Sequence, residues 1–181
     1  NQIHRLLKQY NGNIVLQPND DILVSFIFAI DAVTCAIAIS DLLRGIPDAY
    51  EDGIILVTGN PVDDEGTTLF QETKEKIKIL AEVSLTNTIY MDTTTKSLVD
   101  KVPNVPKFNS EIFKIITIED YLLIKKVLNI ISSEIRNSEF DVEKLNASLG
   151  LSKSQAYRKI KSSTGMPTNK LIQEFRLRQT L

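Results

Sequence analysis

Residues 150–165 read GLSKSQAYRKIKSSTG, and this stretch decides how the end of the chain folds. Gly150 can adopt the left-handed backbone conformation that commonly ends a helix. Ser152 and Gln155 have the spacing of a capping box, in which each side chain bonds the backbone amide of the other, so a new helix begins almost at once. Gly165 closes this second helix. Two helices joined across so short a turn predict a helix-turn-helix.

The second helix of this pair has an apolar face and a basic face. Ala156 and Ile160 are an apolar pair at i and i+4, so we expect them to pack on the preceding helix. Polar and basic side chains share the opposite face. Arginine can bind guanine O6 and N7 through two hydrogen bonds, tyrosine can contact a thymine methyl group or a phosphate, and lysine binds phosphates. The residues predicted to contact DNA are Lys153, Ser154, Tyr157, Arg158, Lys159 and Lys161.

The charge of the chain is divided between its two ends. Residues 1–120 contain 10 Lys and Arg against 18 Asp and Glu, whereas residues 121–181 contain 11 against 5. Strands and helices interleave up to residue 118, and every segment from Tyr121 onward reads as helix. Both changes predict a boundary near 118–120, with one module over residues 1–118 and another over residues 119–181. The net positive second module predicts a polyanionic partner, although a solvated basic face would explain the charge alone.

The first module reads as a mixture of strands and helices. Residues 13–26 predict a hairpin, and the alanine-rich segment that follows predicts a helix ended by Gly45. The two prolines of residues 100–110 predict a loop. The remaining expected elements are strands over residues 53–59, 87–91 and 111–118 and a helix over residues 69–83.

Three features limit the classes of protein to which the chain can belong. Asp31 lies at the centre of the apolar run 22–39, where an ionised carboxylate costs about 2.5–3.5 kcal/mol in a bilayer, so we expect a strand and a buried helix there rather than a membrane span. Cys35 is the only cysteine and His4 the only histidine. Internal disulfides and metal sites built from several cysteines or histidines are therefore excluded. A cytoplasmic location is expected.

The second module resembles a known family. The segments IISSEI (130–135) and FDVEKLNASLGLSKSQAYRKIKSSTGMPTNKLIQEFRLRQ (140–179) closely resemble the first half of the AraC-type DNA-binding domain of bacterial regulators. The resemblance runs from about residue 121 to the end, and Ala156 departs from it because leucine is usual there. The family carries two helix-turn-helix units, whereas this sequence stops inside the helix that would link them. Either the second half is lost or unseen, or one unit suffices.

The first module resembles class III nucleotidyl cyclase domains. The hairpin NGNIVLQPNDDILVSF (11–26) and the helix AIDAVTCAIAISDLL (29–43) occur in the order found in that family. GIILVTG, a helix ending in ILAE and the strand TNTIYM continue the resemblance to about residue 99. The resemblance implies a ferredoxin-like α/β sandwich whose first strand and helix would precede Asn1.

The resemblance also implies which catalytic groups have changed. Class III cyclases hold two metal ions on two aspartates, of which Asp20 matches one and the other would lie on the missing strand. Asp20 is a residual metal candidate, although a solvated hairpin turn explains it as well. Leu16 replaces the lysine that reads the purine, and Glu72 and Lys76 align with the asparagine and arginine that steady the ribose and the transition state. Because loss of one such donor costs roughly 100- to 1000-fold in rate, the combined changes predict no catalysis.

The sequence thus predicts an α+β protein: a ferredoxin-like, cyclase-type sandwich followed by an all-α helix-turn-helix domain. The expected function is that of a sequence-specific transcription regulator whose cyclase-like domain is inactive and serves for dimerisation or ligand sensing. The expected partners are double-stranded DNA and a second copy bound through residues 1–118, without a membrane, a catalytic residue or a cofactor. A small-molecule or nucleotide ligand remains open. The alternative is an active or nucleotide-binding class III cyclase with an attached DNA-binding module.

Overall fold

The computed structural model describes residues 2–16, 21–44, 53–59, 70–85, 87–103, 105 and 111–178. Contacts divide the chain into two compact units, one comprising Asn1–Ile77 and Ser84–Ile115 and the other Lys78–Val83 and Ile116–Leu181. Helices and strands both occur, in agreement with the predicted α+β class. Within the described ranges no helix combines the length and the apolar character that a membrane crossing requires.

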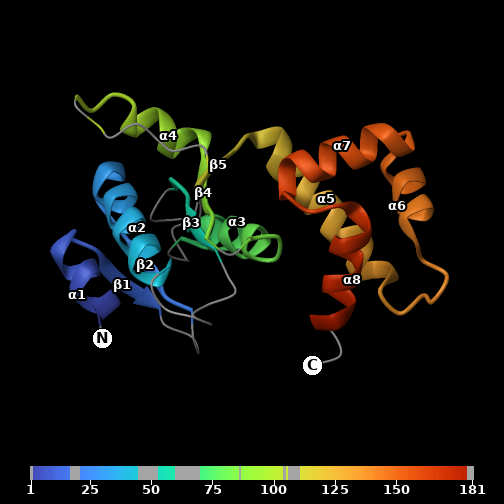
Figure 1. The fold of residues 1–181 in the computed structure, drawn as a ribbon, viewed down its shortest axis with the longest axis horizontal. Helices are drawn as coiled ribbons and strands as arrows, with labels where there is room; N and C mark the ends of the chain where they lie inside the picture. Colours follow the sequence, from blue (N-terminus) through green and yellow to red (C-terminus); the bar gives the residue numbers. More distant parts are fainter. Residues whose placement is uncertain are drawn as a thin grey trace. The chain divides into compact units, whose positions relative to one another are not determined.

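The strands of the first unit form two sheets (Figure 1). β1 and β2 form an antiparallel hairpin with an irregular register between Ile14 and Leu16, and the other three strands have the order β3-β4-β5, with β3 parallel to β4. The predicted hairpin is therefore confirmed, while its tip lies outside the described residues. The elements before residue 117 are α1 (Gln2–Gln9), β1 (Asn13–Leu16), β2 (Leu23–Ser25), α2 (Ala29–Arg44), β3 (Ile54–Leu56), α3 (Gln71–Ala81), β4 (Ile89–Asp92), α4 (Thr93–Val99) and β5 (Phe113–Ile116). The end of α3, from Lys78, and the last residue of β5 belong to the second unit.

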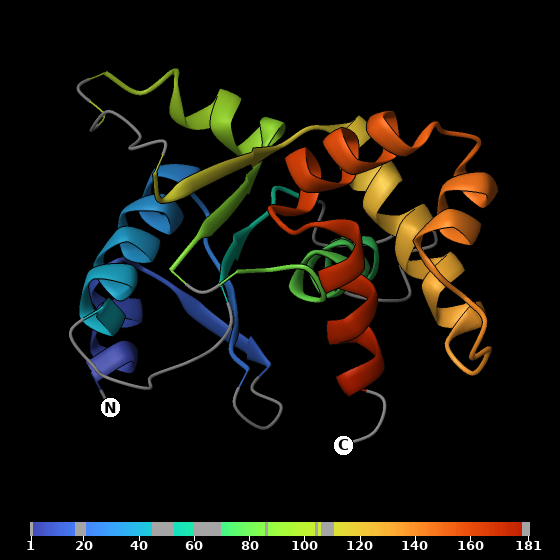
Figure 2. The same ribbon diagram turned by 45° about the vertical axis from the view of Figure 1, so that its right-hand side comes forward.

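The apolar core of the first unit joins α2 to the three-stranded sheet. Helix α2 contacts β3, β4, α1 and α4, and both ribbon views draw α1 beside it (Figure 2). Cys35 lies on α2 and is buried, and burial raises the pKa of its thiol to about 11. Its burial agrees with the buried helix that the apolar run 22–39 predicts. The buried residues that form the apolar core between α2 and the three-stranded sheet are Val33, Ala36, Leu56, Ile89, Met91, Val99 and Phe113.

Helix α4 is an addition to the predicted elements, which place no helix between the strand ending at residue 91 and the loop beginning at residue 100. Its sequence TTTKSLV is rich in β-branched residues, which are weak helix formers. The helix forms because the side chain of Asp92 caps it and because Thr95 and Val99 are buried. Tertiary packing overrides local propensity here.

The carboxylate of Asp92 joins three elements of the first unit. It is 2% exposed, and it accepts hydrogen bonds from Thr95 N at 2.8 Å and Thr58 N at 3.4 Å. Lys76 on α3 forms an ion pair with it, with 2.8 Å between Nζ and Oδ2. Because β3 and β4 are parallel, their carboxyl ends meet at one edge of the sheet, and Asp92 links α3 and α4 to that edge.

The second unit is helical, as predicted from residue 121 onward, and consists mainly of α5 (Ile118–Glu134), α6 (Val142–Leu149), α7 (Lys153–Thr164) and α8 (Thr168–Arg178). Helix α5 begins three residues earlier than predicted, and β5 ends at Ile116 rather than at 118. The correction has a local cause: Thr117 and Asp120 form a capping box that starts the helix. The buried residues of the four helices include Ile124, Val127, Leu128, Ile131, Leu145, Leu149, Ala156, Ile160, Leu171, Ile172 and Phe175.

Replacing Asp92 by alanine should destabilise the protein by about 2–4 kcal/mol, because the change removes a helix cap and leaves the largely buried Lys76 without its carboxylate. The free energy of unfolding, measured in urea, provides the test. Asp100→Ala is the matched control, since Asp100 also pairs with a lysine, Lys96, but on the exposed surface of α4. The control should change stability by no more than about 0.5 kcal/mol. Equal effects of the two substitutions would contradict a structural role for Asp92.

Candidate nucleic-acid interface

Helices α6 and α7 are joined by the turn that the sequence predicts. Asp141 caps α6 by accepting a hydrogen bond from Lys144 N at 2.9 Å. The helix ends at Gly150, whose φ of 69° lies in the left-handed region. Ser152 then caps α7, and its reciprocal bonds with Gln155 form the predicted capping box. The turn between α6 and α7 is thus specified by two caps and one glycine.

Helix α7 is buried on one face only. Ala156 and Ile160 are 0% exposed, as predicted. Ser163 and Thr164 extend the buried stripe toward the end of the helix. All six residues predicted to contact DNA are exposed: Lys153, Ser154, Tyr157, Arg158, Lys159 and Lys161. The sequence of α7 contains four cationic side chains and no acidic one, so its exposed face is positively charged.

Tyr157 and Lys161 form a pair on this exposed face. Lys161 Nζ donates to Tyr157 Oη at 3.3 Å and lies 5.5 Å from the centroid of the ring. The other cations of α7, which are Lys153, Arg158 and Lys159, make no ion pair with any residue in the described ranges. The guanidinium of Arg158 is therefore available for a partner outside the chain, while Tyr157 and Lys161 hold each other in place.

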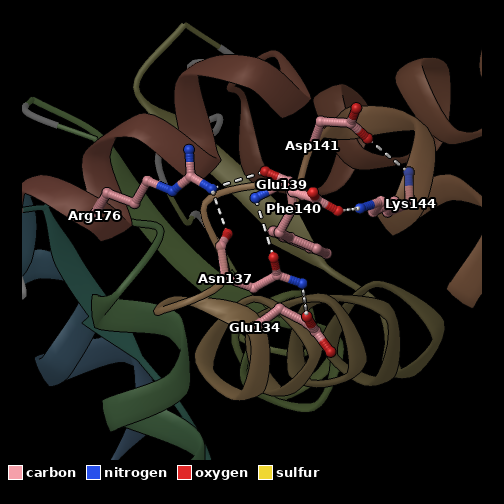
Figure 3. Close-up of polar contacts among 7 residues, drawn as sticks. All are labelled: Glu134, Asn137, Glu139, Phe140, Asp141, Lys144 and Arg176. Atoms are coloured by element: carbon pink, nitrogen blue, oxygen red, sulfur yellow. Dashed lines mark hydrogen bonds and ion pairs between the residues drawn. The ribbon is translucent and has the colours of Figure 1, made fainter.

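Arg176 of α8 forms hydrogen bonds with the turn that precedes α6. Its Nη2 atom donates to the backbone oxygens of Phe140 at 2.7 Å and Asn137 at 3.4 Å (Figure 3). The side chain of Asn137 continues the network by donating to Glu134 at 2.8 Å and accepting from Glu139 N at 3.0 Å. The sequence shows FRLRQ as a motif, but nothing in it indicates that Arg176 bonds a turn 36 residues away.

Three of the cyclase-related positions, Leu16, Glu72 and Lys76, lie in described parts of the first unit. Asp20, the residual metal candidate, lies outside the described residues. Glu72 is exposed on α3, and the ammonium group of Lys76 forms an ion pair with Asp92. The described residues contain no group of three His, Cys, Asp or Glu side chains that could hold a metal ion.

Comparison with known proteins gives one partial match. A stretch of 60 residues is 37% identical to a protein of Formosa agariphila named Histidine kinase P4. This stretch covers 33% of the chain and 4% of the kinase, so the chain spans a small fraction of that protein's length. No family model matches the chain, and no solved structure matches it significantly.

Arg158 and Lys161 should play different parts in binding DNA. We expect Arg158→Ala to cost about 1–3 kcal/mol and to relax the preference at one base pair, because it removes a contact to a base edge. We expect Lys161→Ala to weaken binding to all sequences alike and to lower the salt slope by about one unit, because it removes a phosphate contact. Binding to a selected duplex and a scrambled duplex, measured across salt concentrations, separates these effects.

Arg136→Ala is the control for Arg158→Ala, since Arg136 is an exposed arginine outside α7. It should leave the ratio of the two affinities unchanged. If Arg158→Ala also leaves that ratio unchanged, α7 does not read the sequence of the DNA, and both residues belong to a solvated surface.

Proposed function

We propose that the chain is part of a sequence-specific, DNA-binding transcription regulator. Its second unit is proposed to be the first half of an AraC-type DNA-binding domain, with α7 as the helix that enters the major groove. Its first unit is proposed to be a ferredoxin-like, cyclase-type domain that has lost catalysis and serves for dimerisation or ligand sensing.

The observation that carries this proposal is the exposed face of α7. A helix that begins at a two-residue turn, buries a narrow stripe and presents four cations without an acidic residue fits the charge and the width of the major groove. The basic excess of residues 121–181 supports the same partner, because neutralised phosphates supply much of the affinity for DNA.

The arrangement of the first unit favours a non-catalytic role over an active cyclase. In the cyclase resemblance, Lys76 takes the position of the arginine that would stabilise the transition state. Here its Nζ atom forms an ion pair with the buried carboxylate of Asp92, where it serves to hold α3 on the sheet edge. Glu72, exposed one turn earlier, would bring a negative charge toward a triphosphate.

The first unit also carries a surface suited to association with a second copy. Ile27 and Phe28, which immediately precede α2, are 85% and 63% exposed. Apolar side chains of this size gain free energy when another surface covers them. A dimer would let two copies of α7 bind two half-sites, which raises the affinity well above that of one helix-turn-helix.

Selection from random duplexes should enrich a site with two copies of one half-site, bound by two chains. Phe28→Glu should weaken binding to this site by at least tenfold but leave binding to a single half-site unchanged, because it disturbs association and not α7. Leu98→Glu, at another exposed apolar residue of the first unit, is the control. Failure to enrich any sequence would argue against the proposed function, and enrichment of a single half-site would argue against the dimer.

The protein should form no cyclic nucleotide. Incubation with ATP or GTP and either Mg²⁺ or Mn²⁺ should give no more product than a blank, because the side chains at positions 16, 72 and 76 differ from those that the chemistry requires. Turnover that disappears in an Asp20→Ala variant would support the alternative, an active cyclase with a DNA-binding module. Thermal stabilisation by a nucleotide without turnover would instead indicate a nucleotide sensor.

A further inference from the structure

The carboxylate of Asp120 connects the beginning of α5 with the end of α7. Its Oδ2 atom accepts hydrogen bonds from Thr117 N at 3.1 Å and from Thr117 Oγ1 at 2.9 Å. Its Oδ1 atom accepts from Ser163 Oγ at 2.5 Å. One side chain thus completes a helix cap and also binds the helix that carries the DNA-contacting face.

The bond from Ser163 restrains α7 in a way that its apolar contacts do not. Apolar packing is non-directional, whereas a hydrogen bond fixes both distance and angle, and a bond to an ionised acceptor is stronger than one between neutral groups. Ser163 is 2% exposed, so water cannot readily replace Asp120 as its partner. The neighbouring Thr164 bonds the backbone oxygens of Ile160 and Met166, which stabilises the helix end but does not attach it to α5.

Thr117 is the N-cap residue of α5 and lies close to a boundary between the two units. Its backbone is extended, with φ −77° and ψ 167°, and one of the three points where the chain crosses between the two units lies between Ile115 and Ile116. The capping box requires this backbone conformation, because both the amide and the hydroxyl group of Thr117 bond Asp120. A different backbone conformation at Thr117 would therefore break its bonds to the carboxylate that accepts from Ser163.

We propose that Asp120 is a positioning residue for α7, and that it makes DNA affinity depend on the backbone at Thr117. The proposal rests on the proposed function, since it assigns a control to the same DNA-contacting face. When Asp120 no longer accepts the hydrogen bond from Ser163, a smaller fraction of chains holds α7 in the orientation that binds DNA. The apparent dissociation constant rises in inverse proportion to that fraction, so a fall to about one tenth weakens binding about tenfold.

The first test measures DNA binding by full chains that carry Ser163→Ala, Thr117→Val or both. Each single change should weaken binding about tenfold, and the double change should weaken it by much less than the product, because both act through Asp120. The salt slope should stay at the wild-type value, since no phosphate contact is lost. Thr117→Ser, which keeps the hydroxyl group, should bind like the wild type. Ser132→Ala, at an exposed serine of α5, is the control and should stay within twofold.

The second test needs no DNA and separates this proposal from the proposed function. Hydrogen exchange of the α7 amides should be faster in Ser163→Ala and Thr117→Val than in the wild type, Thr117→Ser and Ser132→Ala. If the wild type binds no DNA but these differences appear, the proposed function fails while the positioning of α7 by Asp120 stands. If Thr117→Val matches Thr117→Ser in both DNA affinity and exchange, the proposal is overturned. The comparison of Thr117→Val with Thr117→Ser tests the proposal even if Ser163→Ala does not fold.

Discussion

The left-handed backbone at Gly150 is the constraint on which the turn between α6 and α7 depends. It lets α6 end with a hydrogen bond from Leu151 N to Asn146 O at 3.1 Å, and it brings Ser152 into place as the cap of α7 two residues later. A Cβ atom at residue 150 would lie more than 4 Å from every atom beyond the adjacent residues, so backbone conformation and not space selects glycine here. The orientation of α7 relative to α6 depends on this turn.

Signals that lie close together in the sequence predicted much of the fold. The capping box of Ser152 and Gln155 and the buried pair of Ala156 and Ile160 act over four residues or fewer, and both are confirmed. The hairpin of the first unit and the exposure of the six basic-face residues were predictable for the same reason. Periodicity reports which face of a helix is apolar without knowledge of its neighbours.

The features that escaped prediction depend on partners far away in the sequence. Helix α4 forms against its own propensity because Asp92 caps it, and Asp92 is itself held by Thr58 and Lys76, which are 34 and 16 residues distant. Asp120 marks the start of a helix only in combination with Thr117, with which it forms the capping box. Its hydrogen bond with Ser163 joins residues that are 43 positions apart in the sequence. Such contacts exist only once the chain has folded, and no spacing rule encodes them.

The hydrogen bonds of Arg176 have a consequence for how this protein can vary during evolution. Arg176 binds the main-chain oxygens of Asn137 and Phe140, and a main-chain oxygen is present whatever residue occupies the position. The exposed positions of this turn can therefore drift in sequence without losing the contact. Position 176 has less freedom, because both bonds come from the Nη2 atom at the end of one long cationic side chain, which a short or apolar residue cannot replace. Mutational tolerance should thus be unequal across the contact, high on the turn and low on α8.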